Sequence, residues 1–242
     1  MSEFTTPTEK VELPSKGLVY PKESPLSSGV IEMKYMTAKE EDILMNQSYI
    51  KKGTAIDKLL KSLIVTEIDY DDMIVGDKNA VMVAARVLGY GPDYSFDYEG
   101  EEHTVDLGQI DNKPFDDSTI TPGLNEFTFT LPHSKIDITY KLLTNKDEKL
   151  ITRELEGLKR LNKNNSPEMS TRMKYIITSV DGDRETKTIR EFVDKRLLAR
   201  DSKSLRNHIK NFQPDVDLTF FPTSDSDGVN IPIRISFFWP DN

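Results

Sequence analysis

The three histidines are the first side chains to examine for chemistry, because an imidazole can bind a metal ion or transfer a proton near neutral pH. They are His103, His133 and His208, and none lies within metal-ligand spacing of another. The chain contains no cysteine, so no thiolate can complete a zinc site of the Cys/His type. We therefore predict no bound metal and no cofactor.

Acidic pairs and glycine-rich segments give no stronger sign of catalysis. The pairs at 101–102 and 116–117 fall in polar stretches, where solvent keeps carboxylates ionised and unsuited to acid–base work. Gly89 and Gly91 begin like a dinucleotide-binding fingerprint, but Tyr94 stands where its third glycine belongs. No phosphate-binding loop or nucleophile elbow occurs. The sequence therefore predicts a protein that is not an enzyme.

Charge is unevenly distributed along the chain, whose formal net charge is −9. Residues 93–126 contain ten acidic side chains and one basic side chain, whereas residues 145–210 contain 17 lysines and arginines and 11 acids. The acidic stretch disfavours a phosphate-rich partner. The basic stretch is either a solvated surface or a nucleic-acid-binding face, and we favour the first reading. We expect neither nucleic acid nor membrane as a partner, while charge complementarity between copies is compatible with a homo-oligomer.

Hydrophobic period and capping signals divide the first half of the chain into short elements. Thr37 to Glu40 has the pattern of a capping box, which opens a helix. Asp77 caps an Ala- and Val-rich helix, and Gly89 and Gly91 end it. The predicted elements are a strand at 30–36, helices beginning at 37, 53 and 77, and a hairpin with strands at 94–98 and 103–107.

The second half of the chain repeats this order. Thr144 to Asp147 resembles a second capping box, and Asp201 can cap a helix that Pro214 ends. The predicted elements are strands at 127–131 and 135–142, helices over 144–162, 168–180, 186–197 and 201–212, and a terminal hairpin with strands at 216–221 and 231–239.

The two halves can be aligned in segments. Thr37 falls on Thr144 at an offset of 107, residues 59–69 fall on 172–182 at an offset of 113, and Asp77 falls on Asp201 at an offset of 124. We predict an α+β fold of internally duplicated helical units, each followed by a ribbon-like β-hairpin without cysteine. Chance matching of amphipathic patterns is the alternative. The predicted organisation is an extended N-terminal arm at 1–29, a first repeat at 30–110, an acidic connector at 111–126 and a second repeat at 127–242.

Apolar side chains at the two ends of the chain are the candidate contacts for a partner protein. The arm is rich in proline and glycine, yet it is too apolar for a free tail, and it packs either on its own domain or on a neighbouring protein. The last predicted strand has aromatic side chains on both faces, which either the chain's own core or a partner must cover. The candidates are Val11, Leu13, Leu18, Tyr20, Phe237, Phe238 and Trp239.

Six motifs in a fixed order resemble the baseplate hub assembly protein family of T4-type bacteriophages. They are VELPSKGLVYP, GDKNAVMVAARVLGYG, SVDGDRETKTIREFV, RDSKSLR, PDVDL and FFWP, and together they extend from Val11 to Pro240. Members of that family tend to carry cysteine pairs in ribbon-like hairpins. The matching hairpins here, at 94–107 and 218–239, have no cysteine, so cross-strand packing must hold them.

The resemblance implies a non-enzymatic role in building the baseplate of a phage tail, as a hub component or as an assembly factor. It further implies that the partners are other tail or baseplate proteins and that the protein acts in the host cytoplasm during assembly, with the virion tail baseplate as a second location. Two alternatives from other classes stay open. One is a baseplate-associated cell-wall hydrolase, and the other is a nucleic-acid-binding protein that uses the basic second half.

Overall fold

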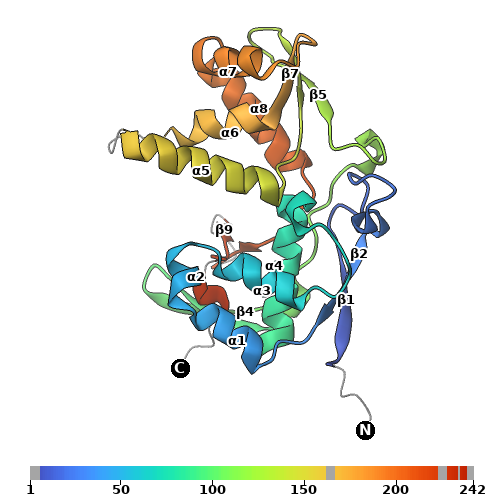
Figure 1. Cartoon of the computed structure of the whole chain (residues 1–242), viewed down its shortest axis with the longest axis vertical. Coiled ribbons are helices and arrows are strands. Elements are labelled where there is room, and N and C mark those ends of the chain that lie inside the picture. Colours follow the sequence, from blue (N-terminus) through green and yellow to red (C-terminus); the bar gives the residue numbers. More distant parts are fainter. Residues whose placement is uncertain (1–5, 162–166, 223–227, 234, 239–242) are drawn as a thin grey trace.

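The computed structural model describes residues 6–161, 167–222, 228–233 and 235–238, which form two lobes (Figure 1). The fold is mixed α+β, as predicted from the sequence, and its sheets have only two or three strands. The first lobe contains β1 (Thr8–Glu12), η1 (Pro25–Ser28), β2 (Val30–Lys34), α1 (Ala38–Met45), α2 (Gln47–Lys51), α3 (Ala55–Leu63), η2 (Tyr70–Asp72), α4 (Val75–Tyr90), β3 (Asp93–Tyr98) and β4 (Glu101–Asp106). The second lobe contains β5 (Phe127–Thr130), β6 (Asp137–Tyr140), α5 (Asn145–Leu161), α6 (Glu168–Ile176), β7 (Ile177–Val180), α7 (Thr186–Lys195) and α8 (Ala199–Phe212).

The end of the chain returns from the second lobe to the first. Its elements are β8 (Thr219–Phe220), β9 (Val229–Asn230) and η5 (Ile235–Phe238). In Figure 1 this red segment lies among the helices of the first lobe. The Phe237 ring packs edge-on against Tyr94 at 4.8 Å between centroids, and Phe220 packs against Phe96 at 5.3 Å. The hairpin predicted for the second repeat is therefore part of the first lobe, so the lobes do not follow the predicted boundaries at this point.

All strand pairs within the described residues are antiparallel. In the first lobe β1 pairs with β2 (Val11 opposite Ile31), and β3 pairs with β4 as predicted (Phe96 opposite His103). In the second lobe β6 is the central strand of a three-stranded sheet, because Tyr140 lies opposite both Phe127 of β5 and Ile177 of β7. Two short connectors, η3 (Leu107–Gln109) and η4 (Asp117–Thr119), lead from one lobe to the other.

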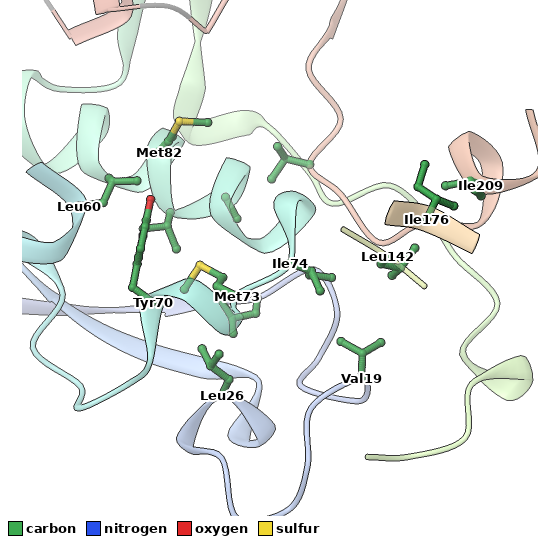
Figure 2. Close-up of a cluster of buried hydrophobic side chains, with 14 of the residues drawn as sticks. Val19, Leu26, Leu60, Tyr70, Met73, Ile74, Met82, Leu142, Ile176 and Ile209 are labelled. Atoms are coloured by element: carbon green, nitrogen blue, oxygen red, sulfur yellow. The ribbon is translucent and has the colours of Figure 1, made fainter. Parts of the chain in front are cut away.

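The cores of the two lobes are continuous. Figure 2 shows Leu60, Tyr70 and Met73 on one side of Ile74, and Leu142 and Ile176 on the other. All of these side chains are buried and belong to a single cluster of apolar residues. The lobes are therefore held together by a shared apolar core. Moving one lobe relative to the other would expose these side chains to water, which is unfavourable.

Two predicted elements are wrong in part. Residues 168–180 were predicted to form one helix, but α6 ends at Ile176 and β7 begins at Ile177, because the free edge of β6 pairs with this segment. Residues 231–239 were predicted to form a strand, but the chain forms η5 there. Phe237 and Phe238 are both 0% exposed. A strand would direct these neighbouring rings to opposite faces, whereas the tight turn allows both to enter the core.

Candidate functional site

The candidate contact residues of the arm lie mainly in the chain's own core. Leu13 and Tyr20 are buried, while Val11 and Leu18 are partly buried and pack against the same cluster. Val11 also lines a groove of about 280 Å³ between β1 and α4. The structure thus places the arm on its own domain, and a partner could reach Leu13 or Tyr20 only if the arm detached.

The aromatic candidates at the other end of the chain are also covered by the protein itself. Phe237 and Phe238 are fully buried and pack edge-on at 5.3 Å between ring centroids. Trp239 lies outside the described residues. Of the two readings left open by the sequence, the structure therefore supports the chain's own core for the two phenylalanines.

A buried carboxylate fixes the loop that joins β1 to β2. Asp77, in the first turn of α4, accepts hydrogen bonds from the Ser15 N–H (2.9 Å), the Ser15 hydroxyl (2.6 Å) and the Tyr20 hydroxyl (2.5 Å). The Tyr20 hydroxyl oxygen in turn accepts from the Ile74 N–H at 3.0 Å. Burial raises the pKa of the Asp77 carboxyl despite these donors. The Asp77 side chain thus has a structural role, since it joins the β1–β2 loop to α4.

The second lobe contains a buried carboxylate that binds a loop in the same way. Asp201, in the first turn of α8, accepts hydrogen bonds from the N–H groups of His133 (2.9 Å) and Ser134 (3.0 Å), in the loop that joins β5 to β6. Burial opposes ionisation, but the two backbone donors outweigh it and hold the pKa of Asp201 below its ordinary value. The part of His133 that binds Asp201 is its backbone N–H group.

A second pair of acids caps the helices that follow the strands. Glu40 accepts from the Thr37 N–H (3.1 Å) and from Lys34 Nζ (2.9 Å), and it is 0% exposed. Asp147 accepts from the Thr144 N–H (3.0 Å) and from Lys141 Nζ (2.8 Å). Both predicted capping boxes are confirmed, and both carboxylates are bound by a threonine N–H group and a lysine of the same chain.

A candidate binding site is the cavity of about 490 Å³ between the two lobes, called here the interlobe cavity. It is formed by the first turn of α4, the segment after β6, and helices α5, α6 and α8. Figure 2 shows four of its apolar residues, Ile74, Leu142, Ile176 and Ile209, from both lobes. Met169 and Met173 of α6 complete the apolar wall.

The charged side chains of the interlobe cavity differ in what they already bind. Arg172 forms two hydrogen bonds to Glu148, at 2.6 and 3.0 Å, which raise the pKa of the guanidinium. Lys141 is paired with Asp147 at 2.8 Å. Arg206 donates from Nε to the Ser202 carbonyl at 3.2 Å and forms no ion pair with another described residue. Arg206 therefore has charge available to a ligand in the cavity.

The residues of this cavity are far apart in the chain, and no sequence pattern links them. Met169, Arg172 and Arg206 come from two helices, while Ile74 and Leu142 come from elements far away in the chain. The spacing of Met169, Met173 and Ile176 at i, i+4 and i+7 is the one local signal, and it indicates a helix with an apolar face but not a cavity.

The structure shows no metal-binding arrangement in its described parts: no group of three His, Asp or Glu side chains could hold an ion there. Within the same residues, no helix combines the length and the apolar character needed to cross a bilayer. Comparison of the chain with models of protein families, with curated protein sequences and with solved structures gave no match.

Proposed function

We propose that this protein is a non-enzymatic scaffold that takes part in building the tail baseplate of a T4-type bacteriophage. The observation that carries the proposal is the ordered set of motifs from Val11 to Pro240 that resembles the baseplate hub assembly family. Its partners would be other tail or baseplate proteins, met in the host cytoplasm during assembly.

The contacts among these motifs support the proposal. Ser15 and Tyr20 of VELPSKGLVYP bind Asp77 of GDKNAVMVAARVLGYG. Asp215 of PDVDL accepts a hydrogen bond from Asn79 of the same GDKNAV motif at 2.9 Å. Motifs that lie far apart in the sequence thus contact one another, as expected of residues that define one fold rather than of unrelated matches.

The proposal includes an origin of the two lobes from one duplicated unit. Lys34, Thr37 and Glu40 make the same contacts as Lys141, Thr144 and Asp147, each 107 positions later. Asp77 lies in the first turn of α4 and binds the loop between β1 and β2, and Asp201 lies in the first turn of α8 and binds the loop between β5 and β6. Met33 forms a bridge with Ile64 after α3, as Tyr140 pairs with Ile177 after α6. An experimental structure tests this origin: if the paired helices run in different directions after superposition, the duplication is refuted.

A stop codon early in the coding sequence tests the function in a phage that encodes this chain. We expect infected cells to accumulate heads and incomplete tails without finished baseplates, visible by electron microscopy of the lysate. Mass spectrometry of purified particles beside the lysate then separates a resident hub component from an assembly factor that leaves. Normal yields of infectious particles without the protein would contradict the proposal.

Purified protein also distinguishes the scaffold from the other function classes. The scaffold role predicts no release of soluble fragments from peptidoglycan and no salt-dependent binding of DNA or RNA. Fragment release would instead support a cell-wall hydrolase, and binding that weakens steeply with salt would support a nucleic-acid-binding protein.

A further inference from the structure

We propose that the interlobe cavity binds an apolar segment of a partner protein that carries a carboxylate side chain. This inference rests on the proposed scaffold function and names the chemistry of one partner contact.

The size and wall of the cavity fit an apolar protein segment. A volume of about 490 Å³ lies within the usual range of ligand pockets. Ile74 from the first lobe and Leu142, Ile176 and Ile209 from the second provide a preformed apolar surface. Because these four residues also belong to the core that joins the lobes, the cavity is part of a fixed framework.

The methionines on α6 adapt the wall to side chains of different shape. Met173 is buried, Met169 is 53% exposed, and both side chains line the cavity. Methionine is unbranched and polarisable, so it repacks around varied apolar groups at protein-binding surfaces. An exposed methionine beside a buried one thus offers an entry site for an apolar side chain of the partner.

The charges of the cavity select an acidic partner over a basic one. Both acids that line the cavity, Glu148 and Glu168, already bind Arg172, at 2.6 and 3.3 Å. Lys141 is likewise paired, but Arg206 forms no ion pair with any described residue. A partner carboxylate could pair with Arg206, and a bidentate contact would fix its orientation. The first turn of α4 also forms one wall, and the positive end of its dipole favours the same sign of ligand.

Peptide binding to the full-length protein tests the inference. The probes are three matched twelve-residue peptides in which leucine and phenylalanine are interspersed with glutamate, with glutamine or with lysine, and the readout is fluorescence polarisation. We expect the glutamate peptide to bind at least about tenfold more tightly than the glutamine peptide, because a hydrogen bond between two charged groups is stronger than one with a neutral partner. The lysine peptide should bind least.

Two pairs of variants locate the binding. Arg206→Gln should remove the preference for glutamate, whereas Arg200→Gln, an exposed arginine at the start of the same helix and outside the cavity, should keep it. Met169→Ser should weaken all apolar peptides, while Met45→Ser, at a similarly exposed methionine of α1, should not. Thermal unfolding of each variant confirms that the fold is retained.

The inference is overturned if no peptide binds, or if binding is unchanged by Arg206→Gln and Met169→Ser. Binding of the apolar anion 8-anilinonaphthalene-1-sulfonate without binding of any peptide would also overturn it, in favour of a small amphiphilic ligand. The phage experiment keeps the two proposals apart. If the stop-codon phage assembles normally, the scaffold function fails whatever the peptides do. If it fails to assemble but the Arg206→Gln protein fully restores it, only the cavity proposal fails.

Discussion

Asp77 and Asp201 are both fully buried, yet their surroundings shift the pKa of the two carboxyl groups in opposite directions. Burial raises the pKa of either group, since it disfavours the charged form. At Asp201 two backbone N–H donors outweigh burial. At Asp77 two of the three donors are hydroxyl groups, and the nearby charge of Asp215 opposes ionisation further.

This difference predicts that replacing each aspartate by asparagine lowers the free energy of unfolding by unequal amounts. The amide of Asp201→Asn can accept only one of the two N–H groups and turns its own donor toward the other, so we expect a loss of about 1–3 kcal/mol in the free energy of unfolding. In Asp77→Asn the hydroxyls of Ser15 and Tyr20 can accept from the new amide, so the loss should be smaller. Urea unfolding of both variants measures the two losses, and an equal or larger loss for Asp77→Asn would contradict this account.

Glu40 predicts how stability depends on pH. Burial would raise the pKa of its carboxyl, but hydrogen bonds from Thr37, Lys34 and Ser62 outweigh burial and lower the pKa from 4.5 to about 2. A lowered folded-state pKa stabilises the protein at pH values above 4.5, and this stabilisation is lost as pH falls from 4.5 toward 2. The loss amounts to roughly 3 kcal/mol for a carboxylate that is 0% exposed.

The check is urea unfolding at pH 7, 4.5 and 3 for the native protein and for Glu40→Gln. The difference in unfolding free energy between the two proteins should shrink as pH falls below 4.5, because the Glu40 carboxylate of the unfolded chain takes up a proton before that of the folded protein does. A difference that stays constant over this range would show that Glu40 titrates normally.

At the scale of elements, the first turn of α4 depends on a glycine. A Cβ at Gly76 would lie 1.9 Å from the carbonyl oxygen of Pro214, which belongs to the segment that returns to the first lobe after α8. Because the obstacle is backbone, Gly76→Ala must separate the two segments, and overpacking of this kind costs about 1–3 kcal/mol or more.

Gly157 in α5 provides the matched control. No atom lies within 4 Å of a Cβ built there, and its backbone is helical. Gly157→Ala should therefore stabilise the protein by roughly 0.5–1 kcal/mol, since alanine loses less conformational freedom in a helix. Opposite shifts of the melting temperature are expected for the two variants, and a stabilised Gly76→Ala protein would refute the close contact.

Local signals predicted the elements whose causes are local. The capping boxes at Thr37 and Thr144 and the hairpin of β3 and β4 depend on neighbouring residues, and they occur where the sequence predicted them. The change from α6 to β7 could not be predicted, since Ile177 becomes part of a strand only because β6 offers a free edge. The interlobe cavity was missed for the same reason: Ile74 and Arg206 meet only in the folded chain.

At the scale of the whole molecule, the end of the chain completes the first lobe. Phe237→Ala removes a fully buried ring that contacts Tyr94, and such a substitution costs about 3–5 kcal/mol. Phe221→Ala, at a ring that is 60% exposed, should cost little. Hydrogen exchange then shows which lobe loses stability. For Phe237→Ala we expect amide exchange to accelerate more in α4 than in α7, and the reverse order would contradict the placement of η5.

The return of the last segment also determines when the protein can finish folding. A ribosome releases the chain from its N-terminus, so β1 to β4 leave the exit tunnel long before Phe237 and Phe238 are synthesised. The second lobe, whose strands and helices lie within residues 127–212, has all of its own elements available earlier than the first lobe does. The half that is made first is therefore completed last, and until Phe237 and Phe238 have left the ribosome the nascent protein exposes the apolar surface that those two rings will cover.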